Sequence, residues 1–298
     1  MRIIKKRYVY IALIALLPVF TIAKMSEKWT EEKIETVHEG NFALPLSQQP
    51  APLFSFGQNL VDKGDLLAFI YPSKLKGPQS DFVEVVPSIL YGLTNRMSLF
   101  IELPIAVKFK HEDTKSRGVS DLIVQLEQIM YAKETKTSVN EVTVVGHMTF
   151  PTGSASKEPA TGFGSPTFFL GATLSRTTTE WYYFTSLGGQ ITTIHKHNKP
   201  GNAFLYQFGV GRNIAYKKDG WILNWMVEVN GIYRQRNIVC NLIDCNSGGN
   251  TLIIGPSIFF STRRFEMDGG IAAVASQHLF GCQTKEHYVA AFYAGWKF

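Results

Sequence analysis

The stretch Met97–Phe109, MSLFIELPIAVKF, alternates with a period of two residues. Its odd-numbered positions are all apolar, whereas the even-numbered positions are mixed and include Ser98, Glu102 and Lys108. Side chains of a β-strand point alternately to opposite faces, so the pattern predicts a strand with one apolar face and one polar face. At about 13 residues it exceeds the usual soluble strand of about 5–6 residues and suits a tilted crossing of a bilayer.

The same alternation recurs from about residue 64 to the C-terminus, in blocks separated by polar or Gly- and Pro-containing segments. A soluble sandwich would also alternate, but its strands are shorter. The pattern therefore predicts an all-β protein, an antiparallel transmembrane β-barrel of about 12 strands, an even number as in single-chain bacterial barrels. The expected strands are 64–73, 82–93, 97–109, 119–131, 140–151, 166–177, 181–194, 203–215, 221–234, 251–262, 265–278 and 287–298.

The connectors between these strands alternate in length. Those at 94–96 and 263–264 are short, whereas those at 152–165 and 235–250 are long. Bacterial barrels have short periplasmic turns and longer external loops, so we assign the two ends accordingly, with 110–118 among the external loops. Residues 24–62, rich in Glu, Lys, Gln and Pro, are expected to be a periplasmic lead-in, and residues 63–298 to form the barrel.

The N-terminus has the order of features of a secretory signal peptide. Four Lys and Arg residues between Arg2 and Arg7 precede the apolar run Tyr8–Ile22, which ends in small residues at Ala23. We expect cleavage after Ala23, hence signal peptide 1–23 and export through the inner membrane; an uncleaved anchor is the alternative. The mature chain would keep 26 of the 30 Lys and Arg against 24 Asp and Glu. This near-neutral balance indicates no nucleic-acid partner.

The three cysteines lie in a chain that we expect to be exported, and disulfides can form outside the cytoplasm. Cys240 and Cys245 close a short loop and are the disulfide candidate, with free thiols as the alternative; the state of Cys282 stays open. His195 and His197 alternate on one loop, but two nitrogens are too few for a closed metal site. The sequence therefore predicts no metal and no cofactor.

The last expected strand carries an aromatic and small-residue face and stops at Phe298. The residues of this face are Tyr288, Ala290, Phe292, Ala294, Trp296 and Phe298. This ending is similar to that of outer-membrane proteins whose final strand is read by the outer-membrane assembly machinery. We therefore expect Trp296 and Phe298 to serve as an assembly signal, and the protein to reside in the cell outer membrane.

Several further stretches carry a family resemblance. They are YGLTNR at Tyr91–Arg96, ELP at Glu102–Pro104, GVSDL at Gly118–Leu122, FPTGS at Phe150–Ser154 and GFGS at Gly162–Ser165. In order and spacing they resemble the family named for the meta-pathway of phenol degradation, whose members are described as outer-membrane transporters. The resemblance implies a porin-like barrel that transports small solutes, with aromatic or apolar compounds as the expected class.

Polar side chains on the face opposite the apolar one are candidates to line the lumen. In a barrel of about twelve strands these groups could pair across the narrow interior, or they could line a path for a solute. The expected lumen-lining residues are Glu84, Glu102, Lys108, Asp121, Glu127, Glu141, His147, Arg212, Glu228, Arg234, Glu266 and Asp268.

The function that these features favour is an outer-membrane channel or transporter for small solutes. A structural or adhesive barrel without transport is the alternative, and a barrel-borne lipid hydrolase is a third. Ser276 with His278, or His147 with Thr149, could supply a hydrolase pair, but no third group that would orient the base is evident, so no enzyme is expected. The expected partners are outer-membrane lipid, the assembly machinery and an unidentified small solute.

Deletion of Phe298 tests the assembly signal. Loss of one aromatic anchor costs only about 1 kcal/mol beyond area burial, so stability alone predicts a mild effect, whereas a recognition defect predicts loss of most folded barrel. The measurement is the heat-modifiable gel shift in outer membranes at low expression, with Phe163→Ala in an external loop as the control. Equal folding of both variants would contradict the signal.

Overall fold

The computed structural model describes residues 37–298, whose regular secondary structure is almost entirely β-strand. Among the described residues the only helices are two short 3-10 turns, η1 and η2, and no helix is long and apolar enough to cross a membrane. The elements are η1 Gly40–Phe42, η2 Leu46–Gln48, β1 Leu66–Lys76, β2 Ser80–Thr94, β3 Met97–Glu102, β4 Ile105–His111, β5 Thr114–Val119, β6 Leu122–Glu134, β7 Ser138–Phe150, β8 Thr167–Thr178, β9 Trp181–Thr192, β10 Ala203–Lys217, β11 Trp221–Arg234, β12 Ile238–Val239, β13 Leu242–Ile243, β14 Gly249–Thr262, β15 Phe265–Leu279 and β16 Tyr288–Lys297.

The main sheet is a closed barrel, because its first strand pairs on both edges. β1 runs antiparallel to β2 on one side, with Leu67 opposite Leu90, and antiparallel to β16 on the other, with Leu67 opposite Lys297. The backbone N–H of Phe298 donates to the carbonyl of Leu66 at 2.9 Å, which extends the closing seam to the last residue. Closure pairs both edges of β1, so the seam exposes no unpaired backbone groups, which a bilayer would penalise.

Two of the wall strands are broken into collinear segments. Of the 14 strands in the sheet, β3 with β4 and β5 with β6 each occupy one wall position, so the barrel has 12 strands as the alternation predicts. Leu103 and Pro104 separate β3 from β4, and proline has no N–H to donate to a ladder. The Pro104 carbonyl instead accepts from the Ser120 N–H at 2.8 Å, at the break between β5 and β6.

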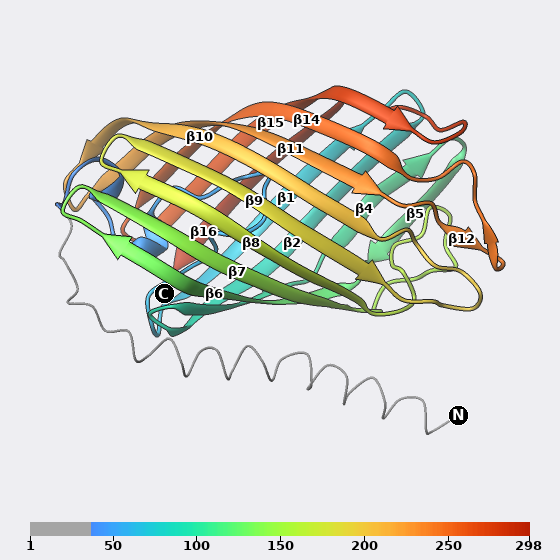
Figure 1. Ribbon diagram of the computed structural model, residues 1–298, viewed down its shortest axis with the longest axis horizontal. Helices are drawn as coiled ribbons and strands as arrows, with labels where there is room; N and C mark the ends of the chain where they lie inside the picture. Colours follow the sequence, from blue (N-terminus) through green and yellow to red (C-terminus); the bar gives the residue numbers. More distant parts are fainter. Residues whose placement is uncertain (1–36) are drawn as a thin grey trace. The chain divides into compact units, whose positions relative to one another are not determined.

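The two ends of the barrel differ in their connections (Figure 1). One end carries the short turns, and the other carries the long connections 151–166, 193–202, 235–248 and 280–287 together with the small β12–β13 hairpin. The segment 110–118, expected as an external loop, instead continues the wall as the β4–β5 hairpin, with His111 paired to Thr114. We refer to the two ends as the short-turn end and the long-loop end.

The two faces of the wall have opposite chemistry. On β8 and β9, Leu170 and Leu187 are 64% and 55% exposed, whereas Thr173 and Ser186 on the other face are fully buried and hydrogen-bonded to each other at 2.8 Å. An apolar exposed face and a polar buried face are the reverse of a soluble protein and typical of a membrane barrel. We call these the outer face and the inner face.

The cysteine expectation is wrong for this structure, because Cys240, Cys245 and Cys282 are all unpaired and exposed. Val239 pairs with Leu242, so Cys240 sits at the tip of the β12–β13 hairpin in a left-handed conformation, with φ of 52°. Cys245 follows the base of the same hairpin. The hairpin therefore separates the two thiols that the short sequence spacing suggested would bond. The predicted signal peptide 1–23 lies outside the described residues.

A charge on the outer face tests the orientation of the wall. Ile89, half-exposed in the middle of β2, faces outward. Ile89→Arg should destabilise the folded barrel by about 2–4 kcal/mol, the cost of a cation near the bilayer midplane. The free energy of unfolding is measured by denaturant titration in lipid vesicles. Ile243→Arg, in the β12–β13 hairpin, should change it little, and equal effects of both changes would disprove the outward assignment.

Candidate functional site

The lumen contains part of the chain's own N-terminal region. The backbone N–H of Asn41 donates to the Thr179 carbonyl at 2.8 Å, and that of Gly64 donates to the Gly92 carbonyl at 2.9 Å. Both partners lie at short turns, so residues 40–61 enter and leave at the same end and run along the inner face between (Figure 1). We call this stretch the inner segment. It corrects the expected lead-in 24–62, whose described part lies against the barrel interior.

Two buried glutamates of the wall hold the backbone of the inner segment. Glu228, in the middle of β11, accepts the N–H groups of Leu53 at 2.8 Å and Phe54 at 3.1 Å, and the hydroxyl of Ser55 at 2.7 Å. Glu127 on β6 accepts two further backbone N–H groups at 2.5 and 3.0 Å, from the adjacent residues 58 and 59. Each carboxylate thus satisfies backbone donors of residues 53–59, a part of the inner segment that forms no helix or strand of its own.

Apolar contacts also attach the inner segment to the barrel wall. The ring of Phe56 packs edge-on against that of Phe169, with centroids 4.8 Å apart. Gly171 and Gly188 make room for these rings, because a Cβ at either position would lie 2.6 Å or less from a ring carbon. Near the exit, Val61 is buried in a cluster with the wall residues Leu67 and Leu90. The inner segment is therefore packed against the wall as well as hydrogen-bonded to it.

A cavity of about 350 Å³ remains between the inner segment and the wall. Its lining is largely aromatic and aliphatic, with a few polar groups placed among them. The aromatic side chains that line it are Phe54, Phe56, Phe69, Tyr71, Phe100 and Tyr293, and the polar ones include Ser88, Glu102, Gln125, His147, Gln207 and Glu266. Such a mixture is typical of sites for small organic molecules.

Most of the predicted lumen residues lie on the inner face. The buried residues of each strand define that face, for example Thr143 on β7 and Asn224 on β11, and the candidates share their parity. Arg234 lies on the inner face at the long-loop end of β11. The candidates on the inner face are Glu84, Glu102, Glu127, Glu141, His147, Glu228, Arg234, Glu266 and Asp268.

Two predicted lumen residues lie on the outer face instead. Lys108 is opposite Val83, because the register shifts between Ala106 and Phe109 and the extra residue of this bulge reverses the alternation. Arg212 is exposed, since Gly209 and Gly211 occupy the inner positions of β10. Its guanidinium lies 5.1 Å from the centroid of the Trp181 ring and 3.5 Å from the Glu180 carboxylate at the short-turn end.

The expected pairing of opposite charges across the lumen is not formed among the ion pairs of the described residues. The buried carboxylates of Glu127 and Glu228 accept hydrogen bonds from backbone N–H groups of the inner segment. The carboxylate of Asp268 accepts a 3.4 Å hydrogen bond from the hydroxyl of Ser257. Within residues 37–298, the one ion pair on the inner face joins Lys297 at the end of β16 to Asp65, just after the inner segment. The inner face is therefore predominantly acidic.

Comparison with known proteins agrees with this architecture. The family model described as "Putative MetA-pathway of phenol degradation" matches residues 63–271. The chain belongs to this family. The matched residues begin just after the inner segment and run from β1 into the middle of β15. Comparison with curated protein sequences returned no match.

A solved structure shows the same fold. An outer membrane channel from Pseudomonas putida F1 superposes with a TM-score of 0.65 and 13% identity, over 84% of this chain and 99% of that one. The NanC porin superposes with a TM-score of 0.47 and 10% identity, over 78% of this chain and 98% of its own. The fold of the protein is thus that of an outer-membrane β-barrel.

The family-like motifs at the long-loop end converge on Asp121. This residue was expected to line the lumen but anchors an external loop: its carboxylate accepts the N–H of Gly153 at 3.0 Å and that of Phe163 at 2.7 Å. Gly162 packs against the same carboxylate, and a Cβ there would lie 2.3 Å from Asp121 Oδ1. The stretches GVSDL, FPTGS and GFGS therefore form one contact, the Asp121 loop clasp.

The hydrolase candidates do not form a complete catalytic group. Ser276 Oγ and His278 Nδ1 lie 3.3 Å apart, but Ser276 is half-exposed and His278 exposed, and the described part of the chain shows no hydrogen bond from the His278 ring to a carboxylate. His147 stacks on Phe169 with ring centroids 4.6 Å apart, while Thr149 bonds Thr167 at 2.9 Å. Neither pair has the oriented base that nucleophilic catalysis uses.

Sequence reasoning missed the aromatic lining of the cavity. Phe69 and Tyr71 lie on the inner face of β1, and Tyr293 lies on that of β16. The sequence did carry one indication of this lining: β1 and β16 have apolar residues at consecutive positions, so both of their faces are apolar and no polar inner face is predicted for them. The contribution of the inner segment carried no signal, because a segment without regular structure has no period to read.

Removal of the Asp121 carboxylate tests the loop clasp. Asp121→Ala deletes two charge-assisted hydrogen bonds, each worth about 1.5–3 kcal/mol, so amide hydrogen exchange at Gly153 and Phe163 should accelerate at least about tenfold. Trypsin should also cut faster after Lys157 in the same loop. Asp113→Ala, in the exposed β4–β5 turn, is the control, and unchanged exchange in Asp121→Ala would mean that the loop is held by other contacts.

Proposed function

We propose that this protein is an outer-membrane channel for small solutes, with aromatic or apolar compounds as the preferred class. The observation that carries the proposal is the aromatic-lined cavity between the inner segment and the wall. A cavity of about 150 Å³ suffices for benzene, so the cavity here, at about 350 Å³, has room for a small aromatic molecule. The family description and the channel-like fold neighbour support the same reading.

The chemistry of the cavity suits a weakly polar solute. Phe69 and Phe100 meet edge to face with centroids 6.2 Å apart, and Phe69 also meets Tyr293 at 5.9 Å, so three rings from β1, β3 and β16 form one wall of the cavity. Aromatic rings in this arrangement can pack against the flat face or the edge of a further aromatic ring, such as that of a bound solute. Glu102 and His147 supply polar groups that can orient a hydroxyl.

The charge of the lumen argues against anions as the solute. The acidic inner face has Arg234 at the long-loop end and Lys297 at the short-turn end as its facing cations. A narrow passage with low-dielectric walls strengthens the field of such charges, which repels anions and admits neutral molecules or cations. The acidic residues on the inner face are Glu84, Glu102, Glu127, Glu141, Glu228, Glu266 and Asp268.

The inner segment would act as the constriction of this channel. It is attached to the wall by hydrogen bonds and packing, and chiefly through Glu127 and Glu228. Burial of a carboxylate is tolerated because several donors compensate it, and the same donors lose their partners when it is removed. Release of the segment would therefore widen the passage without changing the barrel wall.

A rival function, adhesion, draws on a different feature. Leu242 and Ile243 in the β12–β13 hairpin are 73% and 66% exposed at the long-loop end. Exposed apolar side chains on a protruding hairpin are a feature of binding surfaces. Deletion of residues 236–250 that abolished binding to cells or partners, in a barrel with no measurable conductance, would favour adhesion over transport.

The double variant Glu127→Ala with Glu228→Ala tests the channel and its constriction together. In planar bilayers the wild-type protein should show small, stable conductance steps that favour cations, and the variant should show steps several-fold larger because the inner segment leaves the wall. Liposomes containing the protein should also take up phenol faster than empty ones.

The control is Glu134→Ala with Glu180→Ala, which removes two carboxylates near the short-turn end that hold no part of the inner segment. It should conduct like the wild type. Absence of both conductance and solute uptake in wild type and variant would refute the channel. Equal conductance of wild type and variant would refute only the role of the inner segment.

A further inference from the structure

A basic patch lies on the outer face at the long-loop end, across strands β1, β2, β4 and β5. The register puts its members in two rows: Lys74 and Lys108 flank Val83, and Lys76 and Lys110 flank Asp81. The second row continues to β5, where Lys115 is opposite Lys110, and Arg117 is exposed on the same strand. We call Lys74, Lys76, Lys108, Lys110, Lys115 and Arg117 the outer basic patch.

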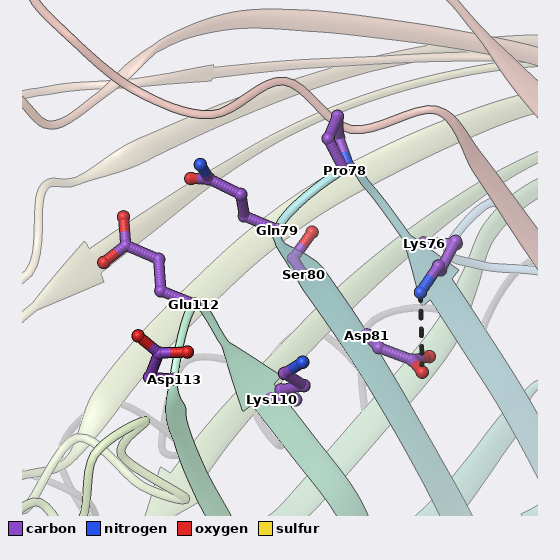
Figure 2. A pocket seen from close by; sticks show the side chains of 8 residues that line it. All are labelled: Lys76, Pro78, Gln79, Ser80, Asp81, Lys110, Glu112 and Asp113. Carbon is purple, nitrogen blue, oxygen red and sulfur yellow. Dashed lines mark ion pairs between the residues drawn. The ribbon is translucent and has the colours of Figure 1, made fainter.

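Asp81 draws the ammonium groups of the patch together. Its carboxylate lies 2.5 Å from Lys108 Nζ, 3.6 Å from Lys76 Nζ and 3.9 Å from Lys74 Nζ. Figure 2 shows Lys76 over Asp81, with Lys110 on the neighbouring strand and the acidic residues of the β4–β5 turn further off. One carboxylate neutralises one of these three cations, so the patch keeps a positive surplus at its centre.

The patch begins where the apolar outer face ends. Upward from Tyr91, every outward position of β2 is apolar until Asp81. With a rise of about 3.3 Å per residue and a tilt of about 40°, Val83 lies roughly 20 Å and Asp81 roughly 25 Å above Tyr91. The apolar band of such barrels is about 25 Å tall. The lysines therefore lie at the height of the lipid head groups.

Four other strands of the wall carry no such cations at this end. At the long-loop ends of β7, β8, β9 and β10 the outward residues are Phe150, Leu170, Ile191 and Phe204, all exposed. A general requirement for solvation of the rim would put charges on those strands as well. The concentration of lysines on β1, β4 and β5, around Asp81 of β2, thus indicates a local anionic ligand.

An open hollow of about 600 Å³ lies beside the patch. Its walls include Lys108, Lys115, Arg117 and Lys157, with Glu158 as the acidic member. Val107, the residue of the bulge, is 52% exposed in the same hollow. An anionic head group held by the cations would have an apolar side chain directly beside it for the adjoining acyl chain.

We propose that the outer basic patch binds the phosphate groups of a phosphorylated lipid in the outer leaflet. Lysine is a compact point charge that suits phosphate, and its long stem lets the ammonium group reach the head groups from the edge of the apolar band. Several lysines converging on one site add their attractions to a multiply charged head group. The inference rests on the membrane placement in the proposed function but not on transport.

The test measures binding of purified lipopolysaccharide to the refolded full-length barrel in detergent, by native mass spectrometry. The patch variant changes Lys74, Lys76, Lys108 and Lys110 to Gln. The control variant changes Lys133, Lys136, Lys217 and Lys218 to Gln, an equal loss of charge at the short-turn end. The patch variant should bind at least about tenfold more weakly, and the control should bind like the wild type.

Two further arms identify the ligand. Enzymatically dephosphorylated lipopolysaccharide should bind the wild type as weakly as intact lipid binds the patch variant, and inorganic phosphate at millimolar concentration should not displace the lipid. Equal binding by wild type and patch variant, equal loss in the control, or indifference to dephosphorylation would overturn the proposal. Displacement by inorganic phosphate would overturn the lipid as the ligand.

Folding of each variant is checked by the heat-modifiable gel shift. If the variant with four substitutions does not fold, the double variant Lys108→Gln with Lys110→Gln replaces it. This double variant should bind the lipid at least about threefold more weakly than the wild type. A barrel that binds the lipid through the patch but conducts nothing would refute the proposed channel and leave this inference intact.

Discussion

The structure depends on one constraint: the backbone hydrogen bonds of every wall strand must be satisfied inside the sheet. β1 meets this constraint by pairing with β2 and β16 at once, and Phe298 donates to Leu66 at the end of the seam. A closed wall turns one set of side chains to lipid and the other to an interior that need not be apolar. The acidic inner face and the exposed leucines of the outer face both follow from that closure.

Closure also creates the problem that the inner segment solves. Twelve strands enclose more space than their own side chains fill, and carboxylates that face this space without partners would be costly. Glu127 and Glu228 find their donors in the backbone of residues 53–59, which in turn needs acceptors because it forms no sheet. The wall and the segment thus satisfy each other, and the cavity left between them is bounded by aromatic rings from both.

Two further groups of charged side chains lie outside the inner face, one at an external loop and one on the outer face. Asp121 closes an external loop over the N–H groups of Gly153 and Phe163, so a motif of the family is explained by loop closure. Lys108, one bulge away from the position that alternation assigns to it, joins Asp81 on the outer face. Charges on this barrel therefore serve three separate purposes: attachment of the inner segment, closure of a loop, and a basic surface at the lipid head-group level.

The sequence by itself determined the barrel, its twelve strands and the position of most inward residues, because a period of two is a local property that each strand carries alone. It could not place Lys108, since a bulge depends on how β4 pairs with β2 and β5. Nor could it place Asp121 or the thiols of Cys240 and Cys245, whose positions depend on turns and on neighbouring chain segments. Arg212 is different, because it shares the parity of the exposed Phe204 and Phe208, so alternation along β10 alone places it on the outer face. The inner segment was decided wholly by tertiary structure, because its contacts with Glu127 and Glu228 join residues far apart in sequence and no local pattern records them.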